Sequence, residues 1–410
     1  MESPETPTTR ARTTDPSPTS TDTETATGTE TDTETETATP EPESEPDLPG
    51  GESLADLAAF DDAWTVESGR AGVPWNEYGD LPAVAMSSDG DSRARFTRKF
   101  DRPRDLSEWD LSVAAQLHST GKGLFQLHLT LVDAHGERSR LSGSIQSTAT
   151  GRWVRLDAGV RESTGIDASA VTELRIEHWA GDAESRFGVA DLRRHSAPER
   201  GYVMLTFDDG PSEDYTVAYD VISAYGFAGA AFLHTETVTG DRGPSVEQYR
   251  EMVADGWDVG GHTHDHTRLS EPPRQSQREI LTENRAFLAE HGLTPTVFRT
   301  PYGAYDGHTL DLMDDLFDVS IVGSGSATGT DLTVFDPSPV GFNPDDYERA
   351  KRFVGAAVEH NRLLGLTIHM APMPSRRAFE SLIEYVHRRE RCGDLAVITP
   401  TELYDDYICD

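Results

Sequence analysis

The chain has 410 residues, with 72 acidic against 36 basic side chains, so its formal net charge at pH 7 is −36. This charge argues against nucleic acid or an anionic membrane surface as a partner, because both would repel the protein. No apolar run approaches the roughly 18 residues that a membrane-spanning helix needs, so no transmembrane segment is expected.

The basic residues are almost all arginine, and the three lysines are Lys99, Lys122 and Lys351. An acidic, lysine-poor surface suits a protein in concentrated salt, where screening weakens self-repulsion. An acidic tail alone does not explain the charge, because the acidic excess continues past the tail. The composition therefore predicts a halophilic, haloarchaeal source.

Residues 1–50 form a low-complexity segment of Thr-Glu and Thr-Asp repeats that ends in a Pro-Glu run. It has too little apolar surface to offset the entropy of ordering, which predicts a disordered tail. The tail could be an O-glycosylated surface stalk or a solvating segment without a role. Its start lacks the basic region and apolar core of a signal peptide. Since such tails often follow an export or anchor signal, we expect the true start upstream of Met1 and an extracellular or cell-surface location.

Residues 52–197 are predicted to form an all-β sandwich. Leu127, Leu129 and Leu131 alternate with other side chains, as in a strand with one buried face, and Gly, Asp and Ser turns separate such segments. Five tryptophans fall in this region: Trp64, Trp75, Trp109, Trp153 and Trp179. Aromatic faces can stack on sugar rings, so a carbohydrate-binding module is one interpretation. The other is that most of these rings fill the core, which is the commoner use of tryptophan.

Residues 198–410 alternate strand-like and helical stretches. Ser245 and Gln248 predict a capping box for a helix that runs to Ala254, and Gly292 is predicted to end the next helix. Seven strand–helix units predict a closed parallel barrel, whose functional residues lie at the carboxyl ends of the strands. The predicted strands are Tyr202–Phe207, Ala228–Leu233, Trp257–His262, Thr296–Arg299, Asp318–Gly323, Leu363–His369 and Leu395–Thr399.

Metal-binding side chains gather at two of these strand ends. Asp209, His262 and His266 offer one carboxylate and two imidazoles, and such a three-ligand set leaves positions for water and substrate, as a catalytic metal requires. The donors suit Zn(II) best, and also Co(II), Ni(II), Mn(II) or Fe(II). His264 would point away from the other two histidines on a helical turn. The alternative, hydrogen-bonded histidines at a strand end, does not account for Asp209.

Four motifs stand in a fixed order: Thr206–Gly210 (TFDDG), His262–His266 (HTHDH), Arg299–Tyr302 (RTPY) and Leu366–His369 (LTIH). This series resembles the polysaccharide deacetylases that share the NodB homology domain, carbohydrate esterase family 4, over about residues 198–408. The resemblance implies a distorted (β/α)7 barrel and a metal triad of Asp209, His262 and His266.

The resemblance also implies four catalytic roles. Asp208 would be the general base that activates a water molecule, and Arg299 would orient its carboxylate. The backbone N–H of Tyr302 would help to form an oxyanion hole. His369 would be the general acid that protonates the leaving amine or alkoxide.

The chain departs from the family pattern around the partner of His369. In the family a carboxylate from a further motif pairs with this histidine, but residues 321–331 lack the expected Trp and Asp-Trp. Asp331 is the best candidate partner. The sequence also leaves open whether Cys392 and Cys409 form a disulfide or remain thiols.

These features predict a metal-dependent hydrolase that removes N-acetyl or O-acetyl groups from a polysaccharide or oligosaccharide. When the group is N-acetyl, the bond cleaved is a carbon–nitrogen bond other than a peptide bond. Two alternatives stay open. One is a hydrolase of a small non-sugar amide with the same fold, and the other is a catalytically decayed carbohydrate-binding surface protein. The sequence specifies neither the polymer, nor the metal, nor the oligomeric state.

Overall fold

The computed structural model describes residues 51–408 except for gaps at 56, 58–59, 73–77, 80, 89–92, 122, 180–183, 241, 323–333, 336–337, 341–343 and 373–374. The predicted tail at residues 1–50, Trp75, Asp331 and Cys409 therefore lie outside the described residues. Cys392 is an exposed free cysteine. No helix in the described part of the chain combines the length and the apolar character needed to span a bilayer.

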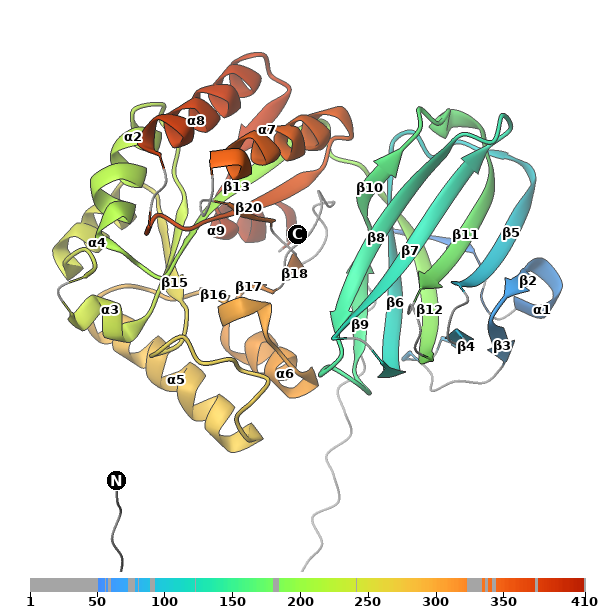
Figure 1. Cartoon of the computed structure of the whole chain (residues 1–410), viewed down its shortest axis with the longest axis horizontal. Coiled ribbons are helices and arrows are strands. Elements are labelled where there is room, and N and C mark those ends of the chain that lie inside the picture. Colours follow the sequence, from blue (N-terminus) through green and yellow to red (C-terminus); the bar gives the residue numbers. More distant parts are fainter. Residues whose placement is uncertain are drawn as a thin grey trace, which may run out of the picture. The chain divides into compact units, whose positions relative to one another are not determined.

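Residues 52–196 form two antiparallel sheets (Figure 1). The first sheet has the order β3 (Arg70–Gly72), β4 (Val84–Ser88), β12 (Ser185–Ser196), β6 (Trp109–Thr120) and β9 (Trp153–Asp157), with β1 (Glu52–Ala55) also paired to β12. The second has the order β10 (Gly159–Ser163), β8 (Arg138–Gln146), β7 (Leu124–Asp133), β11 (Val171–Trp179), β5 (Arg93–Arg104) and β2 (Thr65–Ser68). The short helix α1 (Phe60–Ala63) precedes β2.

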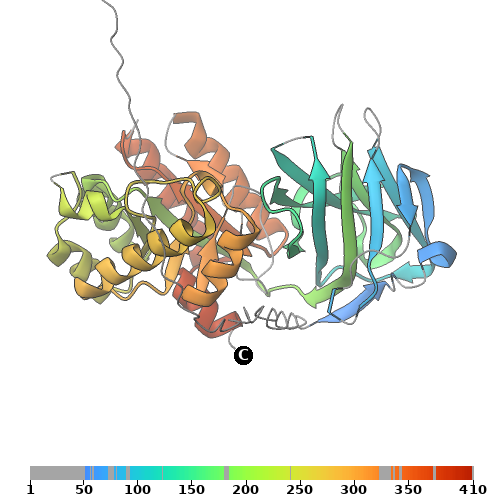
Figure 2. The same cartoon turned by 90° about the horizontal axis from the view of Figure 1, so that it is seen from below.

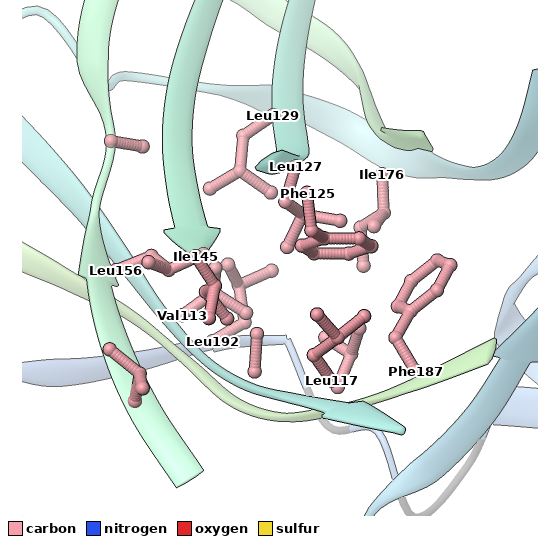
Figure 3. Packing of buried hydrophobic residues seen from close by; sticks show 14 of the residues in the cluster. Val113, Leu117, Phe125, Leu127, Leu129, Ile145, Leu156, Ile176, Phe187 and Leu192 are labelled. Atoms are coloured by element: carbon pink, nitrogen blue, oxygen red, sulfur yellow. The ribbon is translucent and has the colours of Figure 1, made fainter. Parts of the chain in front are cut away.

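The two antiparallel sheets share one buried core. Side chains from β6 and β12 of the first sheet pack against side chains from β7, β8 and β11 of the second (Figure 3). Leu127, Leu129 and Leu131 are buried there, as the alternating pattern predicts. The apolar face of each sheet is thus covered by the other, which is the main source of stability for antiparallel sheets of this kind.

The tryptophans of this region divide between buried and exposed positions. Trp64 is buried in the shared core, and Trp109 and Trp153 are partly buried. Trp179, at the end of β11, has 54% of its surface exposed. The core interpretation is therefore correct for Trp64, whereas Trp179 lies at the surface.

Residues 201–408 form a curled parallel sheet with helices around it (Figure 2). The strand order is β18 (Val334–Phe335), β17 (Val319–Ile321), β16 (Val297–Arg299), β15 (Asp258–Gly261), β14 (Ala230–Leu233), β13 (Gly201–Asp208), β20 (Leu363–Ile368) and β19 (Ser338–Val340), and β21 (Leu395–Val397) also pairs with β13. The helices are α2 (Asp220–Ser223), α3 (Thr235–Thr239), α4 (Val246–Ala254), α5 (Arg274–Glu290), α6 (Gly307–Leu316), α7 (Pro344–Glu359), α8 (Arg376–Arg391) and α9 (Pro400–Leu403).

All seven predicted strands of this region are confirmed, but the expected closed barrel is not. The strand order runs from β18 to β19 without a pairing that joins these two ends in the described residues. The sheet is therefore a curled, open one, and the short strands β18 and β19 at its edges were not predicted.

The local signals act as predicted at two helices. The side chain of Ser245 accepts a hydrogen bond from the backbone N–H of Gln248, whose own side chain accepts from the Ser245 N–H, so a capping box starts α4. After α5 ends, Gly292 adopts a φ of 73°, which the absence of a Cβ permits.

Every residue of β13 and of β20 is buried, as expected for central parallel strands covered on both faces.

Candidate metal centre and active site

Polar side chains follow the carboxyl ends of neighbouring parallel strands. They are Asp208 and Asp209 at the end of β13, His234 after β14, His262 after β15, Arg299 at the end of β16 and His369 after β20. Because these strands pair in parallel, their carboxyl ends lie at one edge of the sheet. This edge is where parallel sheets carry their ligand sites.

Four side chains converge there as a metal-binding group. The Oδ1 atom of Asp209 lies 3.3 Å from Nε2 of His234, 3.6 Å from Nε2 of His262 and 3.5 Å from Nε2 of His266. One donor atom from each residue lies within 4.8 Å of the others. The structure thus brings together Asp209, His262 and His266, and it adds His234.

The donor atoms of this group fit a divalent cation. Asp209 Oδ1 and His234 Nε2 are both buried, and neither has a hydrogen-bond partner. Buried polar atoms in proteins are nearly always paired, so the orphaned pair indicates that a ligand completes the site. Imidazole nitrogens with one carboxylate oxygen are donors that suit Zn(II) and its first-row neighbours.

Hydrogen bonding and burial hold these residues in the protonation states that a metal needs. Nδ1–H of His262 donates to the carbonyl of Arg299 at 2.8 Å, which leaves Nε2 to face Asp209. Burial lowers the pKa of His262 to about 3 and also lowers the pKa of His266. Burial alone would raise the pKa of Asp209, but the contact with His234 and the nearby imidazole of His262 hold this pKa well below its usual value. Neutral imidazoles and an ionised carboxylate are the states that bind cations.

A second cluster, formed by Asp208, Arg299 and His369, adjoins the first. Nε of Arg299 donates to Oδ2 of Asp208 at 2.7 Å, and both side chains are buried. The other oxygen, Oδ1, is buried and has no hydrogen-bond partner. Nε2 of His369 lies 3.9 Å from Asp208 Oδ2. Asp208 is thus held by one oxygen and keeps the second free to accept a proton.

Tyr302 lies at the rim of the site. The residue is 59% exposed, the centroid of its ring lies 4.2 Å from that of His266, and the guanidinium of Arg268 stacks over the ring at 3.9 Å. The ring can therefore form part of a wall beside the metal-binding group.

The backbone is strained at four residues of the site. Asp209, Thr263, His266 and Tyr302 have φ values of 76°, 66°, 65° and 57°. Such left-handed conformations are uncommon for residues other than glycine, and they concentrate at functional positions. The loops after β13, β15 and β16 are therefore held in conformations that local preference does not favour.

Two residues that matter for this geometry were missed by the sequence analysis. His234 stands alone after an apolar run and belongs to no spaced pair, although its position at a strand end was a usable signal. Asn284, buried on α5, donates through Nδ2 to the carbonyl of Thr263 at 2.7 Å and to the hydroxyl of Thr235 at 2.9 Å. No sequence pattern marked Asn284. His264 is exposed, as expected for a residue outside the cluster.

Residues 195–316 match the family model described as polysaccharide deacetylase. This segment of the chain is therefore similar to the polysaccharide deacetylase family. The matched segment contains every residue of the metal-binding group and Arg299 and Tyr302, whereas His369 lies beyond it.

Several curated proteins are similar to this segment. YxkH of Bacillus subtilis, provisionally named a polysaccharide deacetylase, is 30% identical over 120 residues, which are 29% of this chain and 43% of YxkH. The peptidoglycan-N-acetylglucosamine deacetylase PgdA of Listeria monocytogenes is 32% identical over 104 residues, 25% of this chain and 22% of PgdA. A chitooligosaccharide deacetylase of Sinorhizobium fredii is 34% identical over 110 residues, 26% of this chain and 50% of that protein. The chain thus matches at most half the length of these relatives.

Among solved structures, a family 4 carbohydrate esterase from Streptomyces lividans in complex with acetate aligns with 49% of this chain and 94% of its own, at 20% identity and a TM-score of 0.36.

Proposed function

We propose that the protein is a metal-dependent deacetylase that hydrolyses acetyl groups on a polysaccharide or oligosaccharide. The observation that supports this most directly is the pairing of two clusters. A metal-binding group of Asp209 and histidines lies beside a buried carboxylate, Asp208, with one bonded oxygen and one free oxygen. Metal, base and acid are the components of a metal-assisted hydrolase.

Asp209, His262 and His266 would hold the cation, which would supply a Lewis acid that polarises the acetyl carbonyl and makes water more acidic. Asp208 would accept the proton of the attacking water on Oδ1, while Arg299 keeps Oδ2 fixed. The oxygen of the water then bonds to the carbonyl carbon. This arrangement makes the position of Asp208 independent of the substrate.

His369 would complete the reaction as the general acid. It would donate a proton to the leaving nitrogen or oxygen as the bond to the acyl carbon breaks, so that acetate and a free amine or hydroxyl result. The backbone N–H of Tyr302 would donate to the carbonyl oxygen while negative charge develops on it. The left-handed backbone at Tyr302 fixes the direction of that N–H.

The acetylated amino sugars are the preferred substrate class. PgdA is named for the N-acetylglucosamine of peptidoglycan, and the Sinorhizobium enzyme is named for chitooligosaccharides. A small non-sugar amide and a binding protein without turnover remain the alternatives. The first would ignore polymers, and the second would bind no metal.

The deciding experiment measures acetate release by the full-length protein at high salt with added Zn(II) or Co(II). The substrates are N-acetylated chitooligosaccharides, acetylated xylan and an aryl acetate. We expect release from a sugar, and we expect Asp208→Asn to keep its metal but to lose kcat by on the order of 10²-fold or more. Asp265→Asn, a change at an exposed carboxylate in the same motif region, should retain the wild-type rate.

Three outcomes would contradict the proposal in different ways. Metal binding without release from any sugar would favour a small-amide substrate. Neither metal nor turnover would favour the binding protein. An Asp208→Asn variant that turns over at the wild-type rate would remove Asp208 from the role of general base.

We further propose that residues 52–197 form a β-sandwich domain that binds carbohydrate through the outer face of the second sheet, and that residues 198–410 form the catalytic domain. The exposed ring of Trp179 stands beside a groove of about 380 Å³ on this face. Its polar lining can donate and accept hydrogen bonds to sugar hydroxyls, and comprises Arg93, Gln126, His128, Arg140 and Glu177. An apolar ring with polar side chains around it is a suitable platform for a sugar.

This second proposal is tested by co-sedimentation with insoluble chitin, xylan and peptidoglycan. Trp179→Ala should weaken binding to the preferred polymer by about tenfold or more, whereas Trp179→Phe should retain most of it because a ring remains. Unchanged binding by Trp179→Ala would assign the polymer contact to another surface.

A further inference from the structure

The fourth residue of the metal-binding group is not part of the triad expected from the motifs. His234 follows β14, a strand that lies between β13 and β15. Its ring stacks parallel to that of His262, with centroids 5.1 Å apart and an interplanar angle of 2°, and it lies 4.8 Å from the ring of His266. The three imidazoles therefore surround Asp209 Oδ1 from two loop segments, the one after β14 and the one after β15.

The distances at Asp209 are those of atoms that share an ion. Two donors that are each bound to one Zn(II) at about 2.0–2.1 Å can lie no more than about 4 Å apart. The distance from Asp209 Oδ1 to His234 Nε2 is 3.3 Å, slightly shorter than its distances to His262 and His266. His234 thus lies as close to the shared donor as the two histidines of the motif.

A well-aligned hydrogen bond does not explain the position of His234. Nε2 of His234 and Oδ1 of Asp209 are within reach of each other, yet both atoms remain without a hydrogen-bond partner. Such a pair is close in distance but wrongly aligned for a bond between its members. Atoms that are near each other and point to a common third position are what a coordinated cation requires.

The surrounding hydrogen bonds fix His234 against the loop that carries the other histidines. The backbone N–H groups of Thr235 and Glu236 donate to the carbonyls of Thr263 and His264, at 3.3 Å and 3.1 Å. Asn284 joins the same two segments from α5. The hydroxyl of Thr237 lies 3.5 Å from His234 Nδ1, on the side away from Asp209. The ring is therefore preorganised without metal, as ligands of tight sites are.

We propose that His234 is a fourth protein ligand, so that three imidazoles and one carboxylate hold the metal of the proposed active site. This inference depends on the metal site of the proposed function but adds a residue outside its triad. A third nitrogen donor should raise the affinity for Zn(II), Co(II) and Ni(II) and strengthen the preference for them over Mg(II) and Mn(II).

The test counts imidazoles on the metal and does not require turnover. X-ray absorption of the Zn(II)-loaded full-length protein should fit three imidazoles per zinc in the wild type and two in His234→Ala. In competition with a chelator, His234→Ala should bind Zn(II) more weakly by at least about tenfold, since even the loss of a residue that only supports a ligand costs 10–100-fold.

Matched variants make the result interpretable. His264→Ala removes an exposed histidine two residues from His262 and should leave affinity and imidazole count unchanged. Asp209→Ala should abolish binding. His234→Gln keeps much of the side-chain volume, and equal melting temperatures of the metal-free forms would exclude misfolding as the cause of weaker binding.

The outcomes separate this inference from the proposed function. Two imidazoles in the wild type, or an affinity of His234→Ala within twofold of the wild type, would overturn the fourth ligand while leaving the deacetylase proposal intact. Three imidazoles without acetate release would support His234 and contradict the deacetylase. A wild-type protein that binds no Zn(II) would overturn both.

Discussion

Asp208 and Asp209 are adjacent in sequence, but their carboxylates have different surroundings. Asp208 is buried against the guanidinium of Arg299, whereas Asp209 is partly exposed and faces three imidazoles. Two neighbouring carboxylates with different environments can take different roles, one in proton transfer and one in metal binding.

Arg299 has two separable functions in this arrangement. Its side chain holds Asp208, while its backbone carbonyl accepts the hydrogen bond from His262. Arg299→Ala should therefore retain the metal, because the carbonyl remains, but lose most activity. Removing one member of a buried ion pair should also lower the free energy of unfolding by about 3–5 kcal/mol. Metal content, kcat and denaturant unfolding measure these effects.

The matched control for this substitution is Arg285→Ala, at an exposed position on α5. It should leave activity and stability unchanged. Loss of metal from Arg299→Ala at full folding would contradict the separation of the two functions, because it would mean that the side chain also supports His262.

The sequence could place together the site residues that stand in spaced motifs. Asp209, His262 and His266 lie close together in the folded chain because each ends a strand or lies in the turn after it, and parallel strands align their carboxyl ends. His234 and Asn284 obey the same geometry but have no partner at a fixed spacing, so only the folded chain relates them to the site. Asp331, the candidate partner of His369, lies outside the described residues.

At the scale of elements, the parallel strands were predictable because their apolar runs are uniform. The closure of the sheet was not, because it depends on β18 and β19, two edge strands of two and three residues that are too short to give an apolar pattern. The outer face of the second antiparallel sheet also differs from a simple alternating pattern. Thr130 and Glu177 face outward in the strand pattern but are buried, because neighbouring side chains such as Arg95 cover them.

Asp133 connects three elements of the two-sheet region. Its carboxylate accepts hydrogen bonds from the backbone N–H groups of His135 and Glu137 in the turn between β7 and β8, and from that of Asp167 before β11. The bond from Asp167, followed by those from the turn, lowers the pKa of Asp133. A lowered folded-state pKa means that the ionised carboxylate stabilises the fold above the unfolded value of about 3.9.

The stability that Asp133 contributes is therefore present at neutral pH and is lost as the pH falls below about 4 toward the folded-state pKa. Asp133→Asn should lower the melting temperature at pH 7, and the difference from wild type should shrink at pH 3. Asp101→Asn, at an exposed position on β5, should match wild type at both values. A difference that grew on acidification would have the wrong sign for this mechanism.

For the molecule as a whole, the formal charge of −36 is the dominant long-range property. The screening length over which like charges repel each other is about 10 Å at 0.1 M salt and falls to about 3 Å at 1 M. We expect the melting temperature to rise steadily between 0.1 M and 2 M NaCl. Sodium sulfate at equal ionic strength would separate screening from preferential exclusion, because sulfate adds the second effect.

A melting temperature that did not depend on NaCl would contradict a role for self-repulsion.

The composition alone predicts the rise of the melting temperature with salt, because the net charge depends only on how many acidic and basic residues the chain has. It could not show that basic residues concentrate on particular strands. The twelve residues of β5 carry Arg93, Arg95, Arg98, Lys99, Arg102 and Arg104, within a strongly acidic chain.

The left-handed backbone at Asp209, Thr263, His266 and Tyr302 has a consequence for how such a domain can change over time. Holding each residue there costs about 1–3 kcal/mol, which the rest of the fold must offset. Gly210 and Gly303, which directly follow Asp209 and Tyr302, also have positive φ values, so the chain already places glycine where no side chain is needed. If the site were no longer under selection, substitution of these four residues by glycine would remove the strain and stabilise the fold. The four side chains other than glycine at these positions are therefore kept at a cost in stability.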